Sequence, residues 1–142
     1  MSDPSIGHEA LRNGIFSALD DADIDGILAA GEPASFDEGQ TIFETGDRGD
    51  GMFIVTKGEA RVDVGGRFHI LKAGDFFGEM AVIAPGPRMA TVKAVTAVET
   101  IKIGAEDFQA FLLAHPKVSL SILKAVVLRL REVEQRIDAW MA

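Results

Sequence analysis

The stretch of the chain that decides its fold, residues 76–92, reads FFGEMAVIAPGPRMATV. Gly78 stands near its start, where the lack of a Cβ lets the backbone come close to a ligand. The amides of Met80 and Ala81 would then open a short helical turn, and the N-terminus of a helix is a favourable anion site. Further along, Arg88 carries a planar guanidinium that matches two phosphate oxygens. The stretch therefore predicts a site for a small phosphorylated ligand.

The residues around the arginine extend this prediction to the rest of the ligand. Glu79 is an acceptor when ionised, so it suits a sugar hydroxyl and would repel a phosphate. Arg88 and Glu79 should therefore divide a phosphorylated ribose between them. The backbone amide of Ala90 and the hydroxyl of Thr91 are further candidate contacts to the ligand.

The pattern F-G-E-hydrophobic-A, then a short variable stretch and R-small-A-x-V, resembles the phosphate-binding cassette of the cyclic-nucleotide-binding domain family. This family includes catabolite activator proteins, regulatory subunits of cAMP-dependent protein kinase and cyclic-nucleotide-gated channels. A second signature of the family lies upstream, where residues 42–58 read IFETGDRGDGMFIVTKG. The similarity runs from about Ile15 to the end of the chain. It implies that Arg88 binds the cyclic phosphate and that Glu79 binds the free ribose 2′-hydroxyl.

One position departs from the family pattern. Met89 stands where the family usually has Ala, Ser or Thr. In the family, Thr or Ser there is associated with contacts to the phosphate or to a syn guanine, and Ala leans towards cAMP. Because a thioether cannot donate a hydrogen bond, we expect cAMP to be preferred over cGMP.

Between the two ends of the chain, short apolar runs alternate with Gly, Asp and Pro. Such a pattern predicts an antiparallel sandwich or barrel. Gly65 and Gly66 predict the clearest hairpin, because both positions of a two-residue turn favour glycine. Examples of the expected strands are Thr41–Phe43, Met52–Val55, Ala60–Val64, Phe68–Leu71, Thr91–Val95 and Val98–Ile103.

We therefore expect an α+β fold, with residues 1–142 forming a single cyclic-nucleotide-binding domain. Residues 1–32 form N-terminal helices, 33–103 form an antiparallel, jelly-roll-like β-roll, and 105–141 form two C-terminal helices. The cassette at 76–92 adds a short phosphate-binding helix to the roll.

Apolar residues recur every three or four positions along the second C-terminal helix, which Pro116 opens. This seam could serve a homodimer or pack on the roll. Trp140 belongs to this seam, and its spacing favours packing in the core or in a dimer. The alternative is that Trp140 covers the purine as a lid, since a lid from the last helix recurs in the family. The seam comprises Leu120, Leu123, Val126, Val127, Leu130, Val133, Ile137, Trp140 and Met141.

Composition narrows the function classes. The net charge is −8, and residues 1–50 hold twelve acids against two bases, which disfavours nucleic-acid partners. No helix-turn-helix motif follows the last helix, so direct DNA binding is not expected. No cysteine, no signal peptide and no long apolar run is present, so we expect a cytoplasmic protein without a membrane span.

Catalysis finds no support in the sequence. His8, His69 and His115 are scattered, so neither a catalytic group nor a metal site is predicted. A cupin-like metal enzyme would need two or three His on the strands of the roll. The leading interpretation is a sensor without enzymatic activity or cofactor, whose ligand is cAMP or possibly cGMP. Ligand binding would repack its last helix, and the changed surface of that helix would act on a second copy or an effector protein. A degenerate, ligand-free module for protein–protein contact is the alternative.

Overall fold

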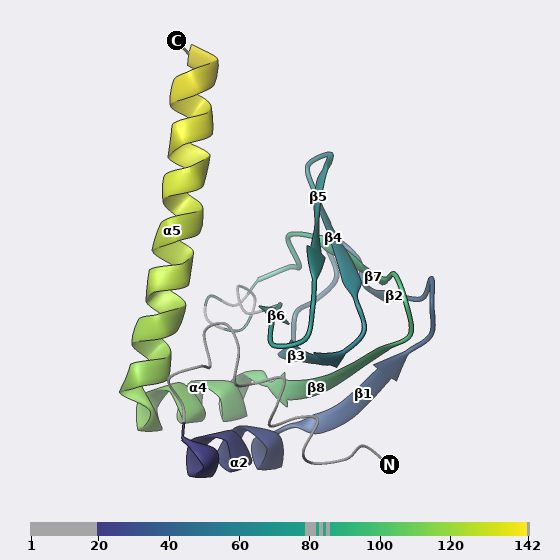
Figure 1. Cartoon of the computed structure of the whole chain (residues 1–142), viewed down its shortest axis with the longest axis vertical. Coiled ribbons are helices and arrows are strands. Elements are labelled where there is room, and N and C mark those ends of the chain that lie inside the picture. Colours follow the sequence, from purple (N-terminus) through teal and green to yellow (C-terminus); the bar gives the residue numbers. More distant parts are fainter. Residues whose placement is uncertain (1–19, 79–81, 83, 85, 142) are drawn as a thin grey trace.

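The computed structural model describes residues 20–78, 82, 84 and 86–141, with the side chains at 125, 129, 133 and 137–141 outside this description. A β-roll of two sheets rests on two short helices, and a long helix rises beside it (Figure 1). The elements are α2 (Asp21–Ala30), β1 (Glu32–Phe36), β2 (Thr41–Phe43), β3 (Gly51–Lys57), β4 (Ala60–Val64), β5 (Arg67–Leu71), β6 (Phe76–Phe77), β7 (Thr91–Ala94), β8 (Val98–Gly104), α4 (Ala105–Ala114) and α5 (Pro116–Met141).

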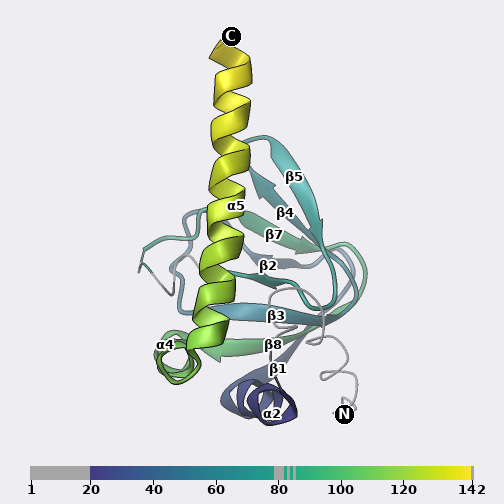
Figure 2. The same ribbon diagram turned by 60° about the vertical axis from the view of Figure 1, so that its left-hand side comes forward.

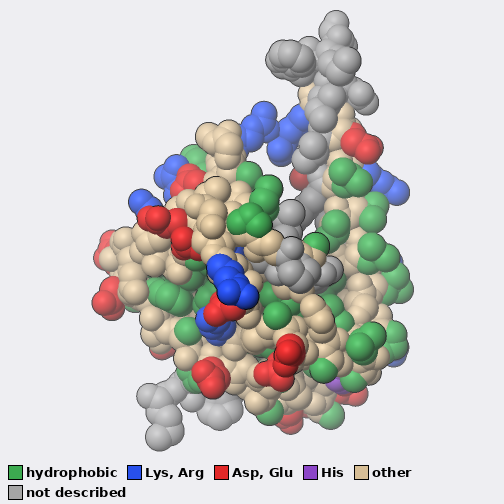
Figure 3. Space-filling model, turned by 180° about the vertical axis from the view of Figure 1, so that it is seen from behind, with side chains coloured by type: hydrophobic (Ala, Val, Ile, Leu, Met, Phe, Trp, Pro, Cys, Tyr) green, Lys and Arg blue, Asp and Glu red, His purple; other side chains and the backbone are tan. Residues whose placement is uncertain are grey.

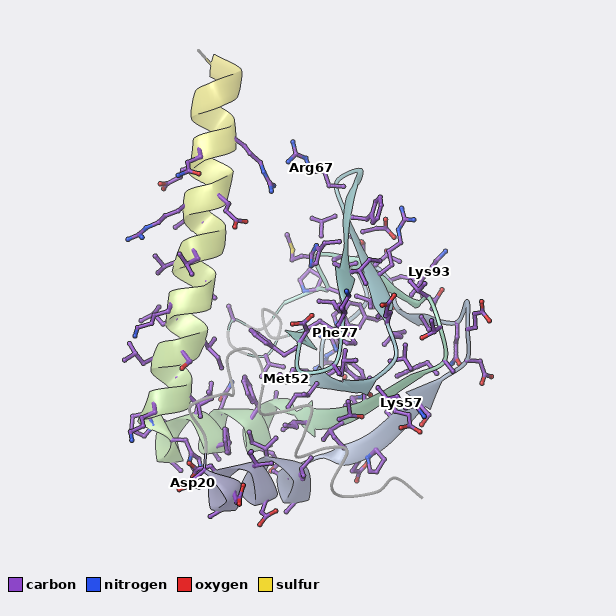
Figure 4. All side chains as sticks on the ribbon, in the orientation of Figure 1. Asp20, Met52, Lys57, Arg67, Phe77 and Lys93 are labelled. Atoms are coloured by element: carbon purple, nitrogen blue, oxygen red, sulfur yellow. The ribbon has the colours of Figure 1, made fainter. Side chains whose placement is uncertain are left out.

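The roll consists of two four-stranded antiparallel sheets, ordered β1-β8-β3-β6 and β2-β7-β4-β5. Strand β3 is buried on both faces, because helices cover one side of its sheet and the second sheet covers the other. Met52 and Ile54 therefore enter a core shared with the helices. Phe53 and Val55, which alternate with them, enter the core between the sheets. Figure 4 shows Met52 and Phe77 within the molecule.

The helical layer is held by capping and apolar packing. Asp20 caps α2 by accepting from the backbone N–H of Asp23 at 2.8 Å. Buried residues of α2, α4 and α5 share one core in this layer: Ile24, Ile27, Phe108, Phe111, Val118 and Ile122. His115 Nδ1 lies 3.1 Å from the Asp23 carboxylate, so it joins the end of α4 to α2.

The expected β-roll and C-terminal helices are confirmed. Gly65 and Gly66 have φ values of +54° and +81°, as a tight hairpin turn requires. Strands β1 and β6 are not among the examples named from the sequence. The strand expected at Thr91–Val95 is one residue shorter in the structure, where β7 ends at Ala94. The helix expected within residues 1–19, and most of the short helix expected after Gly78, lie outside the described residues.

Helix α5 exposes most of those of its apolar side chains that the structure describes. Val118 and Ile122 are buried near its start, whereas Leu123 and Leu130 are 58% and 55% exposed. Figure 2 shows the helix standing alongside the roll, and Figure 3 shows hydrophobic side chains gathered along it. In the described part of the chain, no single helix has the length and apolar character of a membrane span. Helices α4 and α5 reach it only as a pair, and they are bent by 107°.

The packing of α2 on α4 can be tested by creating a cavity in the helical core. Ile27→Ala should lower the free energy of unfolding by about 2–5 kcal/mol, because Ile27 is fully packed in the helical core. Leu113→Ala is the control, since Leu113 is 87% exposed and its loss should cost no more than about 0.5 kcal/mol. Urea unfolding measures both values. Equal stabilities would contradict the packing of α2 on α4.

Candidate anion-binding site

A buried guanidinium lies at the centre of the site. The Arg88 side chain is only 4% exposed. Its Nη1 donates to the carbonyl of Gly78 at 3.1 Å, and its Cζ lies 4.2 Å from the centre of the Phe43 ring. Nη2 is 3.8 Å from Oδ1 of Asp50, which is too long for a hydrogen bond. A buried guanidinium attracts anions strongly, because little water screens its charge. The position therefore suits anion binding.

The backbone around Arg88 is fixed by the loop between β2 and β3. The N–H of Arg88 donates to the carbonyl of Asp47 at 2.7 Å, and its own carbonyl accepts from the N–H of Gly46 at 2.8 Å. An isolated β-bridge between Arg48 and Pro87 continues this pairing. The two sequence motifs, 42–58 and 76–92, thus meet in space and hold the arginine between them.

Gly78 has two structural reasons to be glycine. Its φ is +84°, in the left-handed region that side chains disfavour. A Cβ added there would lie 2.6 Å from Nη1 of Arg88 and 3.2 Å from the carbonyl oxygen of Gly51. The glycine therefore makes room for the guanidinium. This role adds to the close approach to a ligand that the sequence indicated.

The other predicted site residues divide into three groups. Thr91 is next to the arginine loop, and its Oγ1 accepts from the N–H of Thr45 at 3.1 Å. Ala90 packs against the core between the sheets, whereas Met89 is 61% exposed, so its thioether does not fill that core. Several residues lie outside the described part of the chain: Glu79, Met80, Ala81 and the side chain of Trp140.

Sequence reasoning missed two charged residues at the site. The Asp50 carboxylate approaches both Arg88 and Lys102, whose Nζ lies 3.4 Å from the same Oδ1. Asp50 belongs to the motif at 42–58, which could have drawn attention to it. Lys102 comes from β8 and gave no local signal, because only the pairing of β8 with β3 brings it there. Among the described residues, no group of three or more His, Cys, Asp or Glu could hold a metal ion.

Comparison with known proteins identifies the family of the chain. Residues 33–115 match the family described as the cyclic nucleotide-binding domain. A CRP-like cAMP-activated global transcriptional regulator of Mycobacterium tuberculosis is 26% identical over 132 residues, which cover 89% of this chain. A cyclic nucleotide-gated potassium channel of Rhizobium etli is 36% identical over 115 residues, which cover 81% of this chain. The chain therefore belongs to the cyclic nucleotide-binding domain family.

A solved structure extends the similarity to the fold. The catabolite activator protein of Thermus thermophilus superposes with a TM-score of 0.79 at 28% identity, over 87% of this chain and 61% of that one. The chain spans 59% of the mycobacterial relative and 32% of the channel. It is a regulatory domain of this family.

The glycine at the site gives a direct test. Gly78→Ala should lower the free energy of unfolding by about 1–2 kcal/mol, because the added Cβ is strained at this φ and presses on Arg88. Gly86→Ala is a matched control in the same segment, since the nearest atom to its Cβ would be 3.9 Å away. Thermal and urea unfolding compare the two variants. Equal stabilities would contradict this role of Gly78.

Proposed function

We propose that this chain is a cyclic-nucleotide sensor in which Arg88 binds the cyclic phosphate. The observation that carries the proposal is the burial of the guanidinium, 4% exposed, at the place where the two sequence motifs meet. A phosphate oxygen would give Arg88 a short, charge-assisted hydrogen bond. Family membership supplies the ligand class, a 3′,5′-cyclic nucleotide.

The remaining contacts are assigned from the sequence motif. Glu79 would accept from the ribose 2′-hydroxyl, while the amides of Met80, Ala81 and Ala90 would donate to the phosphate. The hydroxyl of Thr91 is a further candidate donor. Met89 offers no hydrogen-bond donor to a guanine, so the proposed ligand is cAMP in preference to cGMP.

The route from the site to α5 follows contacts around Val82. Val82 is fully buried in the core that contains Phe111 on α4 and Ile122 on α5. Its carbonyl accepts from Nε2 of Gln109 on α4 at 2.8 Å. Movement of the cassette would therefore displace groups packed against both helices. A ligand shifts α5 only if it binds one helix arrangement better than the other.

Calorimetric titration tests the binding proposal. The unmodified protein should bind cAMP more tightly than cGMP. Arg88→Ala should weaken cAMP binding by about two to three and a half decades, since removing one partner of a buried ion pair costs about 3–5 kcal/mol.

Arg61→Ala is the matched control. Arg61 also contacts an aromatic ring and a carboxylate, but its side chain is 46% exposed. The Arg61→Ala variant should bind cAMP with unchanged affinity. Absence of heat and of any thermal shift with either nucleotide would contradict the proposal and favour a ligand-free interaction module.

The exposed face of α5 is the proposed output surface. An open groove of about 360 Å³ runs along it. Because so much apolar surface on one helix is unfavourable in water, we propose that a second copy covers it. The groove is lined by Leu120, Leu123, Lys124, Val127, Leu128 and Arg131. An effector protein is the competing occupant. Direct nucleic-acid contact and enzymatic activity are not part of the proposal.

Sedimentation velocity tests the dimer. Leu130→Asp should convert a dimer into a monomer, because it places a carboxylate in the apolar face. Leu113→Asp is the control, since Leu113 is an exposed leucine on α4 rather than α5. A monomeric unmodified protein would overturn this part of the proposal.

A further inference from the structure

Two cations share one carboxylate oxygen at the edge of the site. Oδ1 of Asp50 lies 3.4 Å from Nζ of Lys102 and 3.8 Å from Nη2 of Arg88. The carboxylate is therefore closer to the lysine than to the arginine. This cluster of three charges carries one net positive charge, whereas Asp50 and Arg88 alone would be neutral.

We propose that Lys102 is a positioning residue that sets the affinity for the anionic ligand by drawing Asp50 away from Arg88. The proposal rests on the function proposed above. A phosphate and Asp50 compete for the same guanidinium, and their like charges repel each other. By giving Asp50 a second partner, Lys102 lowers the cost of replacing the carboxylate with the phosphate.

The surroundings of Asp50 suit such an exchange. Its carbonyl accepts from the N–H of Ala105 at 3.2 Å, so the start of α4 fixes its backbone. Its side chain, however, is 71% exposed, and it can turn between the two cations. Lys102 is held opposite Phe53 in the β3–β8 register, and its Nζ lies 5.7 Å from the centre of the Phe53 ring. The sheet thus fixes the position of Lys102, and the exposed side chain of Asp50 can turn towards it.

Lys102→Met is the informative variant, because it keeps an apolar stem of similar length and removes only the charge. It should weaken cAMP binding by about two- to fivefold, which is the range expected for a partly exposed ion pair. Added salt should reduce the difference, since screening weakens charge effects and leaves packing unchanged. Lys102→Arg should restore the affinity of the unmodified protein.

Lys57→Met is the matched control for loss of a positive charge. Lys57, labelled in Figure 4, is the last residue of β3. Asp50 directly precedes the first residue of that strand, about 20 Å away by the rise of a strand. The Lys57→Met variant should bind cAMP with unchanged affinity. Thermal unfolding of each variant without nucleotide should give the same midpoint, because the pair is largely exposed.

A double-mutant cycle with Asp50→Asn decides whether the lysine acts through the aspartate. In the Asp50→Asn background, Lys102→Met should have a much smaller effect on affinity than it has alone. An undiminished effect, or no effect of Lys102→Met in the unmodified background, would overturn the inference. If the unmodified protein itself binds no nucleotide, the proposed function fails instead.

Discussion

The need to accommodate one buried positive charge governs the arrangement of the site. Arg88 is almost fully enclosed, and a buried guanidinium is costly unless polar groups surround it. The carbonyl of Gly78 and the face of Phe43 contact this side chain, and the loop at residues 46–48 fixes its backbone. The fold thus places a guanidinium in an enclosed position, where its attraction for an anion is screened little by water.

This constraint also explains why the site lies where two cores meet. Phe76 and Phe77 of β6 directly precede Gly78, and they point into different cores, one shared with the helices and one between the sheets. Phe77 stacks on Phe53 with ring centroids 5.0 Å apart. A change in the backbone at Gly78 would therefore alter packing on both sides of the sheet. Of the two cores, the helical core is the one that contains residues of α5.

The sequence predicted features that depend on local chemistry, such as the Gly65-Gly66 hairpin, the start of α5 at Pro116 and the β-roll itself. It did not predict features that depend on distant partners. Strand β6 has only two residues and exists through its pairing with β3. Strand β1 contains Pro33, which argues against a strand, but β1 lies at a sheet edge where proline is tolerated. The motif singled out Arg88, whereas the approach of Lys102 required the β3–β8 register. The roles of Glu79, Met80, Ala81 and Trp140, and a cytoplasmic location, stay predictions.

A crystal structure of the protein with cAMP would test the role of Arg88 most directly. We expect a phosphate oxygen about 2.7–2.9 Å from a guanidinium nitrogen of Arg88, the distance of a charge-assisted hydrogen bond. Nucleotide bound elsewhere, with the contacts of Arg88 to Gly78 and Asp50 unchanged, would contradict the assignment of this arginine as the phosphate-binding group.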